Sequence, residues 1–269
     1  MRLEDVRGFV FDVDGTLAHR AGEEVHLIDG ALEVLQRVRA SGRPFAIFTN
    51  GSHLSPAGFA RDLREAGLPI EDGQMLTPLR SALHYLERHH PGALVRLFAT
   101  AVAEEYMAAA GVRLASAEEA EAADVVFVAH RYEASLDELE HAARAVRGGA
   151  RLLTGSYVAA YAGAHGPILS RGAMMAAAIA KVSGVRPTVV GKPSKAAIAV
   201  IAERLGLPTT QIAVIGDDLG MDIALGRLGG SRTILVRSGI SGQLDLAAIP
   251  ERQRPDAVVD NVAELLPLL

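Results

Sequence analysis

The chain has 269 residues with a formal net charge of −5, 49% hydrophobic and 22% charged residues, and no cysteine. This length and balance indicate a globular protein with one core and an insertion. Because the chain has no cysteine, it cannot form disulfides, a thiolate nucleophile or a zinc–cysteine site. The acidic net charge argues against nucleic acid as the main partner. Small phosphorylated metabolites remain possible ligands.

The first residues of the chain carry charges and then enter a strand-like segment. They lack the basic start, apolar stretch and small-residue cleavage site of a signal peptide. No segment has the roughly 18 uncharged apolar residues that a membrane span requires. Together with the absence of cysteine, these features predict a cytoplasmic protein with no membrane partner.

Short apolar segments alternate with longer amphipathic ones along the first part of the chain. The pattern predicts a strand at Gly8–Phe11, a helix at Ala31–Arg39, a strand at Phe45–Phe48 and a helix at Pro56–Ala66.

The middle of the chain repeats this alternation on a smaller scale. Strands are predicted at 94–98, 125–129 and 152–154, and helices at 104–110, 136–146 and 172–182. We therefore expect residues 80–184 to form a second α/β domain inserted into the first.

The last part of the chain returns to the first pattern. Further strands of the core are predicted at 188–190, 212–215 and 233–236, and helices at 196–205 and 222–228. Uniformly apolar strands separated by helices predict an α/β fold with a doubly wound parallel sheet covered on both faces. Residues 1–79 and 185–269 would form this core.

Two carboxylates follow the first predicted strand. Asp12 and Asp14 would share one side if the strand continued, and Gly15 allows the chain to turn away. Adjacent carboxylates at a buried strand end repel each other, and one can act as nucleophile while the other acts as general acid and base. A helix-capping turn is the plainer interpretation, but a cap needs only one acidic residue.

Two later segments suit a phosphate group. Thr49, Asn50 and Gly51 offer a hydroxyl and exposed backbone amides, although turn residues after any strand look similar. Lys192, one of three lysines, follows an apolar strand and could offset negative charge on a phosphoryl group and on Asp12. The alternative is an exposed loop lysine.

A second acidic segment follows the predicted strand at 212–215. It contains Asp217, Asp218 and Asp222, which together need a counter-charge. Magnesium prefers such oxygen ligands, with several more from water and phosphate. The alternative is an acidic turn with a helix N-cap, which Asp222 partly fits.

These motifs, in this order, resemble the haloacid dehalogenase superfamily: Asp12-x-Asp14-Gly15-Thr16, then Thr49, then Lys192, then Gly216-Asp217-x4-Asp222. The resemblance covers the predicted core. The Thr-Asn-Gly-Ser form of the second motif and the Gly-Lys-Pro-Ser form of the third resemble subfamily IIA, the nitrophenylphosphatase-like group that includes nucleotide, phosphoglycolate and pyridoxal phosphatases. The insertion resembles the C2 cap of that group.

The resemblance implies a Rossmann-like core, a cap, and a Mg²⁺-dependent phosphatase that acts through an aspartyl-phosphate. Its substrate would be a small phosphomonoester metabolite of the nucleotide, sugar phosphate, phosphoglycolate or pyridoxal phosphate type. The resemblance also implies that Asp12 attacks phosphorus and that Asp14 protonates the leaving oxygen and later activates water. Phosphate binding would fall to Thr49, the Asn50 amide, Gly51 and Lys192. Magnesium would be held by Asp12, Asp217 and the Asp14 backbone carbonyl, with Asp218 or Asp222 supporting.

The inserted domain departs from the resemblance at two strand ends. His130 and its neighbours stand where the group commonly has an Asp, and Gly155 stands in place of the second residue of a Thr-Asn or Thr-Asp pair. The substrate therefore stays open. The segment Ser156–Arg171 is predicted to be a loop that contacts it, through polar and aromatic side chains that stack on a ring or bind a second anion: Tyr157, Tyr161, His165 and Arg171. Alternatively, the tyrosines pack inside the cap.

Two other functions share these motifs. A phosphomutase or phosphotransferase uses the same core, and a phospho-accepting signalling domain also combines acidic residues, a Thr or Ser, a Lys and magnesium. Signalling domains of that kind phosphorylate an Asp at the third strand and carry no cap. The sequence leaves the oligomeric state open, with a homodimer as one option.

Overall fold

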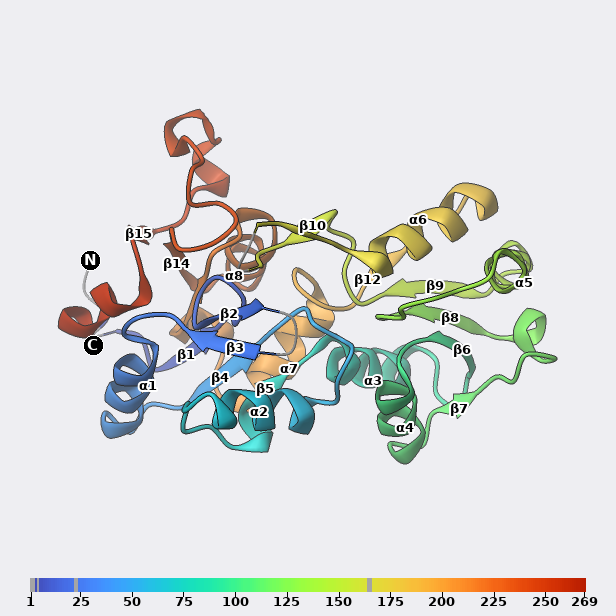
Figure 1. Ribbon diagram of the computed structural model, residues 1–269, viewed down its shortest axis with the longest axis horizontal. Helices are drawn as coiled ribbons and strands as arrows, with labels where there is room; N and C mark the ends of the chain where they lie inside the picture. Colours follow the sequence, from blue (N-terminus) through green and yellow to red (C-terminus); the bar gives the residue numbers. More distant parts are fainter. Residues whose placement is uncertain (1–2, 4, 22–23, 164–165) are drawn as a thin grey trace.

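The computed structural model describes residue 3 and residues 5–21, 24–163 and 166–269. Two parallel β-sheets lie side by side, each with helices on both faces (Figure 1). The first sheet contains strands from both ends of the chain, and the second contains strands from its middle. This arrangement confirms the predicted α/β fold with an inserted α/β unit.

The first sheet has the strand order β15-β14-β13-β1-β4-β5, with every neighbouring pair parallel. The strands are β1 (Gly8–Phe11), β4 (Phe45–Phe48), β5 (Met75–Leu76), β13 (Ile212–Gly216), β14 (Arg232–Val236) and β15 (Ala257–Val259). The chain runs outward from β1 on one side and later returns on the other. The carboxyl end of β1 therefore lies where the strand order reverses, the place where ligands bind in open α/β sheets.

Helices cover both faces of the first sheet because its strands are apolar on both sides. Phe9, Phe11 and Ile47 face α1 (Ala31–Ala40), α2 (Pro56–Glu65) and the 3-10 helix Val262–Leu268. Val10, Phe48 and Val214 face the opposite layer, which consists of α7 (Lys195–Leu205) and α8 (Ala224–Gly229). All six of these side chains are buried.

The second sheet has the order β12-β9-β8-β6-β7, also parallel throughout. Its strands are β6 (Leu94–Phe98), β7 (Arg113–Leu114), β8 (Val125–Val128), β9 (Arg151–Thr154) and β12 (Thr188–Val189). One face packs on α3 (Pro78–His89) and α4 (Ala101–Ala109), and the other on α5 (Leu136–Arg147) and α6 (Arg171–Ser183).

Two antiparallel hairpins and several short turns complete the described chain. The hairpins are β2–β3 (Ala18–Ala21 and Glu24–Leu27) and β10–β11 (Ala160–Tyr161 and Ile168–Leu169). Short 3-10 helices span Asp72–Gln74, Ala120–Ala122, Thr209–Gln211, Leu246–Ala248 and Glu251–Gln253, and a π-helical turn spans Leu219–Ile223. No helix in the described ranges is long and apolar enough to cross a lipid bilayer.

The structure differs from the sequence prediction at several places, and it contains elements that were not predicted, including helix α3 and strands β5, β7 and β15. Strand β12 was expected in the first sheet, but it pairs with β9 in the second, which therefore extends to Val189. The segment Ser156–Arg171, expected to be a loop, contains the hairpin β10–β11, whose strands of two residues each are too short to show an alternating pattern. Helix α8 begins at Ala224 instead of Asp222, because the π-helical turn precedes it.

Helix α6 starts in close contact with the end of β8. A Cβ atom on Gly172 would lie 2.3 Å from the backbone oxygen of Ala129. We predict that Gly172→Val lowers the free energy of unfolding by about 1–3 kcal/mol, the usual cost of overpacking. Valine has a better helix propensity than glycine, and this offsets less than about 0.5 kcal/mol of the loss. Chemical denaturation measures the change.

The control is Met174→Val in the same helix, where the side chain is 54% exposed. Surface substitutions usually stay within about 0.5 kcal/mol of the parent. Equal stability of the two variants would contradict the close packing of α6 on β8.

Candidate active site

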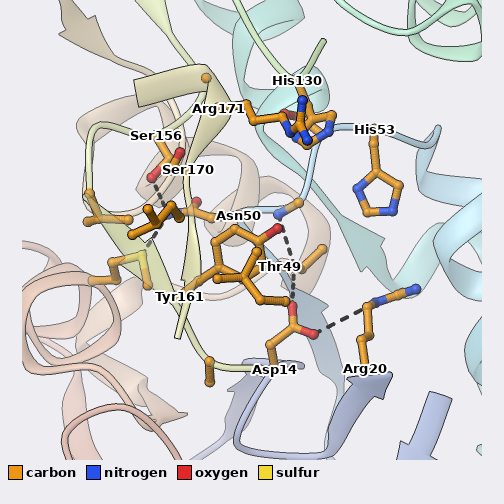
Figure 2. Close-up of a pocket in the computed structure, with 18 of the residues that line it drawn as sticks. Asp14, Arg20, Thr49, Asn50, His53, His130, Ser156, Tyr161, Ser170 and Arg171 are labelled. Carbon is orange, nitrogen blue, oxygen red and sulfur yellow. Dashed lines mark hydrogen bonds and ion pairs between the residues drawn. The ribbon is translucent and has the colours of Figure 1, made fainter. Parts of the chain in front are cut away.

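The carboxyl ends of both sheets face one cavity of about 290 Å³. The first sheet contributes residues that follow β1, β4 and β13, and the second contributes residues that follow β8 and β9 (Figure 2). Residues from the first sheet and its loops are Asp12, Asp14, Arg20, Thr49–His53, Asp217, Met221 and Ile240. Residues from the second sheet and its loops are Ala129, His130, Tyr132, Ser156, Val158, Tyr161, Ala162 and 168–172.

Asp12 sits at the end of β1 and is 7% exposed. The ammonium group of Lys192 donates to its Oδ1 atom at 2.5 Å and to Oδ1 of Asp222 at 2.6 Å. Burial by itself would lower the pKa of Lys192, but the two carboxylates outweigh this and raise it, so the ammonium stays charged. Lys192 and Asp222 lie behind Asp12 and are not among the residues that line the cavity.

Asp217, at the end of β13, completes a buried acidic group with Asp12 and Asp222. Each of the three offers a carboxylate oxygen within 4.8 Å of the others. Burial, followed by the charge of Asp222, raises the pKa of Asp217 to about 8. Lys192 supplies one positive charge against three carboxylates. The raised pKa of Asp217 shows that the group lacks positive charge, which a divalent cation such as Mg²⁺, with its preference for hard oxygen donors, would supply.

Two glycine-containing loops close tightly around Asp217. Gly15 has a φ of 85°, which favours glycine, and a Cβ atom there would lie 2.6 Å from Oδ2 of Asp217. The same oxygen accepts a hydrogen bond of 2.6 Å from the backbone N–H of Ile240. The hydroxyl of Ser238 donates to the carbonyl of Gly15 at 2.7 Å and joins the two loops. This contact holds the carboxylate on the cavity wall.

Asp218 and Asp222 have different positions, which the sequence did not separate. Oδ1 of Asp218 accepts from the backbone N–H groups of Gly220 and Met221 and caps the π-helical turn. Asp222 turns inward to Lys192 and is 1% exposed. The capping function therefore belongs to Asp218, and the buried acidic group includes Asp222.

Asp14 is less buried than Asp12 and faces the cavity. Its Oδ2 atom accepts from the hydroxyl of Thr49 at 3.4 Å, and its Oδ1 atom lies 3.7 Å from Nε of Arg20 (Figure 2). Burial raises the pKa of Asp14, while Arg20 acts in the opposite direction. A carboxyl group with a raised pKa can carry a proton to a reacting oxygen near neutral pH.

Asn50 connects the segment after β4 to the loop that carries Lys192. Its Nδ2 atom donates to the carbonyl of Lys192 at 2.8 Å, and its Oδ1 atom accepts from the N–H of Lys192 at 2.7 Å. The Ser194 hydroxyl donates to the carbonyl of Val190 at 2.9 Å and accepts from Ala197 at the start of α7. The Lys192 loop is thus fixed on both sides.

Gly51, next to Asn50, lines the cavity, and its N–H donates to Thr49 Oγ1.

The substrate-contacting residues predicted in the insertion are only partly brought together. Tyr161 and Arg171 line the cavity, together with Ser156. Tyr157 is 39% exposed and does not line it. His165 lies outside the described residues.

Among the cavity residues that the sequence did not predict are three with polar or charged side chains, namely Arg20, His53 and Tyr132. His53 packs edge-on against His130 of the second sheet, with 5.5 Å between ring centroids, and His130 packs against Tyr132 at 5.0 Å. His53 lies only one residue beyond the Thr-Asn-Gly-Ser motif, so its place was accessible from the sequence. Tyr132 lies shortly after β8, at the strand end where the sequence departs from the resemblance. Arg20 carried no sequence signal, because its approach depends on how hairpin β2–β3 folds over the cavity.

Two family models match the chain. One, described as haloacid dehalogenase-like hydrolase, matches residues 9–113, and the other, described as HAD-hydrolase-like, matches residues 189–265. The matched segments include all the motif residues of the first sheet. The chain belongs to the haloacid dehalogenase-like hydrolases. It is a phosphoric monoester hydrolase of that family, and the fold is of the NagD and p-nitrophenyl phosphatase type.

Curated relatives and solved structures match nearly the whole chain. Sugar-phosphatase AraL of Bacillus subtilis is 26% identical over 97% of this chain and 92% of that protein. Acid sugar phosphatase of Staphylococcus aureus is 25% identical over 89% of each. The structure of 4-nitrophenylphosphatase from Thermotoga maritima has a TM-score of 0.86 and 26% identity, and covers 98% of this chain and 97% of that one. NagD from E. coli K-12 has a TM-score of 0.83 and 25% identity, covering 96% and 98%.

The buried lysine generates a prediction about stability. Lys192→Met would leave Asp12 and Asp222 buried without their shared counter-charge. We expect the free energy of unfolding to fall by about 3–5 kcal/mol, as when one partner of a buried ion pair is removed. Chemical denaturation of the metal-free protein measures this change.

Lys195→Met is the matched control, because Lys195 is exposed three residues further on. Its free energy of unfolding should stay within about 0.5 kcal/mol of the parent. A Lys192→Met variant as stable as this control would show that the ammonium does not hold the acidic group together.

Proposed function

We propose that this chain hydrolyses small phosphomonoesters with Mg²⁺ through an aspartyl-phosphate on Asp12. The observation that carries the proposal is the pair of carboxylates at the end of β1. Burial raises the pKa of both carboxyl groups, and both line the cavity. Asp12 is ion-paired with the charged Lys192, which favours its anionic form. Asp14, two residues on, has no lysine contact in the described part of the chain and lies against Thr49 and Arg20. One group is suited to attack as an anion, and the other to transfer a proton.

In the first step, a carboxylate oxygen of Asp12 forms a bond to phosphorus as the bond from phosphorus to the ester oxygen breaks. Asp14 gives its proton to the departing oxygen, so the alcohol leaves neutral. In the second step, Asp14 removes a proton from water, which attacks phosphorus, releases inorganic phosphate and restores Asp12.

Other residues of the chain hold the phosphoryl group during these steps. The Thr49 hydroxyl and the Asn50 main-chain N–H would contact its oxygens, with Gly51 leaving room for them. Lys192 offsets the charge of Asp12 from behind. Bound Mg²⁺, held by Asp12, Asp217 and the Asp14 carbonyl with Asp222 supporting, would neutralise charge on the transferring group.

The size of the cavity supports a small substrate. A volume of about 290 Å³ lies at the lower end of the range for small-molecule sites. The curated relatives are named sugar phosphatases, which favours a phosphorylated sugar or a similarly short compound.

The proposal is tested by release of inorganic phosphate from nitrophenyl phosphate, with MgCl2 or with excess chelator. We predict turnover only with the cation. Asp12→Asn should show none, because an amide cannot act as the nucleophile.

Asp29→Asn is the control for this experiment. Asp29 is exposed, lies just before helix α1 in the part of the chain that forms the first sheet, and is distant in sequence from the motifs. It should retain parental turnover. Full activity of Asp12→Asn, or of the parent in chelator, would refute the covalent mechanism or the metal dependence respectively.

A second prediction concerns Asp14. Asp14→Asn should slow turnover of an alkyl phosphate by about two to four orders of magnitude, the span of a general acid–base group. The loss should be smaller for nitrophenyl phosphate, because nitrophenolate leaves without needing a proton. Rates of the two substrates under saturation give the comparison, and an equal loss on both would exclude Asp14 as the acid.

A further inference from the structure

Arg20 occupies the cavity wall beside the proposed general acid. It lies on strand β2, and its side chain is 13% exposed. Nη1 donates to Oδ2 of Asp62 at 3.3 Å, Nε lies 3.7 Å from Oδ1 of Asp14, and the guanidinium stands 5.2 Å from the ring centre of Phe59. These contacts hold the guanidinium in one place.

Part of this guanidinium is not satisfied by the protein. Nε and Nη2 are buried and have no hydrogen-bond partner among the residues that the structure describes, and the same holds for Oδ1 of Asp14, which lies 3.7 Å from Nε. A buried donor without a partner costs free energy comparable to a lost hydrogen bond, so such a group calls for a ligand or a water molecule. Because Arg20 lines the cavity, an incoming substrate can reach it.

The opposite wall of the cavity is also suited to negative charge. Helix α6 begins there, with Ser170, Arg171 and Gly172 lining the cavity, and the start of a helix favours anions. Nε2 of His130, on the same side, is buried without a described partner.

Permanent positive charge in this part of the cavity comes from the arginines. Burial and Arg20 lower the pKa of His53 to about 4, and burial and Arg171 lower the pKa of His130. Both histidines are therefore neutral near pH 7 and can serve only as uncharged hydrogen-bonding groups.

We propose that Arg20 binds a second anionic group of the substrate, a carboxylate or a further phosphate, located close to the ester oxygen. The inference rests on the proposed function, because it identifies the ester oxygen by its proximity to Asp14. Asp14 contacts that oxygen in the proposed mechanism, and Nε of Arg20 lies 3.7 Å from Oδ1 of Asp14.

An anion explains these contacts better than a neutral sugar hydroxyl does. A guanidinium has donors in a fixed fork that matches a carboxylate or phosphate with two parallel bonds, and Nε with Nη2 is such a pair. Short phosphorylated acids and short bisphosphates carry this second anion within reach.

The test compares substrates that differ in a single group. 3-Phosphoglycerate and glycerol 3-phosphate share one skeleton, with a carboxylate in the first replaced by a hydroxymethyl group in the second. Glycerol 1,3-bisphosphate provides the phosphate at the same position. kcat/KM is measured with Mg²⁺ for each, alongside nitrophenyl phosphate, and calorimetry measures binding of the same compounds.

The variants separate anion binding from a structural role. Arg20→Gln removes the charge, and Arg20→Lys keeps the charge without the fork. Asp62→Asn removes the ion pair that anchors Arg20 but leaves the cavity donors. Arg61→Gln is the matched control, because Arg61 is exposed on the neighbouring helix α2.

We expect the parent to favour at least one of the two compounds with a second anionic group over glycerol 3-phosphate by about tenfold or more, the lower range of a charge-assisted hydrogen bond. Arg20→Gln should abolish that preference, Arg20→Lys should restore part of it, and Arg61→Gln should leave it intact. The compound with the larger Arg20-dependent preference identifies the anion as carboxylate or phosphate.

The inference would be overturned by equal kcat/KM for the compounds with and without a second anionic group, or by an equal fall on every substrate in both Arg20→Gln and Asp62→Asn. Either result would leave the phosphatase proposal standing. If no ester is hydrolysed, the proposed function fails instead. Calorimetry then tests the inference by itself. Binding of a compound with a second anionic group that depends on Arg20 supports the anion site, and the absence of such binding refutes the site.

Discussion

The buried contact between Lys192 and the carboxylates of Asp12 and Asp222 is the interaction on which the rest of the site depends. It joins residues 180 positions apart, from the end of β1 and from the loop before α7. Carboxylates in this position repel one another, and their burial costs free energy unless a positive charge is paired with them. The folded arrangement of the strand ends therefore requires Lys192 to lie between Asp12 and Asp222. Asn50 and Ser194 hold its loop, and the charge cluster therefore couples β1, β4, β13 and α7.

The two sheets contribute different chemistry to one cavity. The strand ends of the first sheet provide carboxylates, a threonine and the buried lysine, which are groups that can act on a phosphoryl group. The strand ends of the second sheet provide His130, Ser156 and the start of α6, and these can contact only what lies beyond that group. A change in the second sheet can therefore alter the choice of substrate while the chemistry of the first stays the same.

Hairpin β2–β3 is an exception to this division of the cavity chemistry between the two sheets. It belongs to the first sheet's part of the chain, yet Arg20 places a guanidinium beside the cavity, against α2 and close to Asp14. Its packing on Phe59 and its ion pair with Asp62 position the charge before any substrate arrives, which reduces the entropy lost on binding. If Arg20 binds a substrate anion as we propose, substrate discrimination depends on this hairpin as well as on the inserted unit.

The sequence by itself determined the α/β class, the ends of the strands and the residues placed there. Apolar runs closed by Asp12, Thr49 and Asp217 are local patterns, and local patterns can be recognised without knowing the path of the chain. Only the tertiary structure decided that Asp222, not Asp218, turns inward, that β12 joins the second sheet, and that Arg20 reaches the cavity. Each of these depends on contacts between segments far apart in sequence, and the packing of whole sheets and helices selects them.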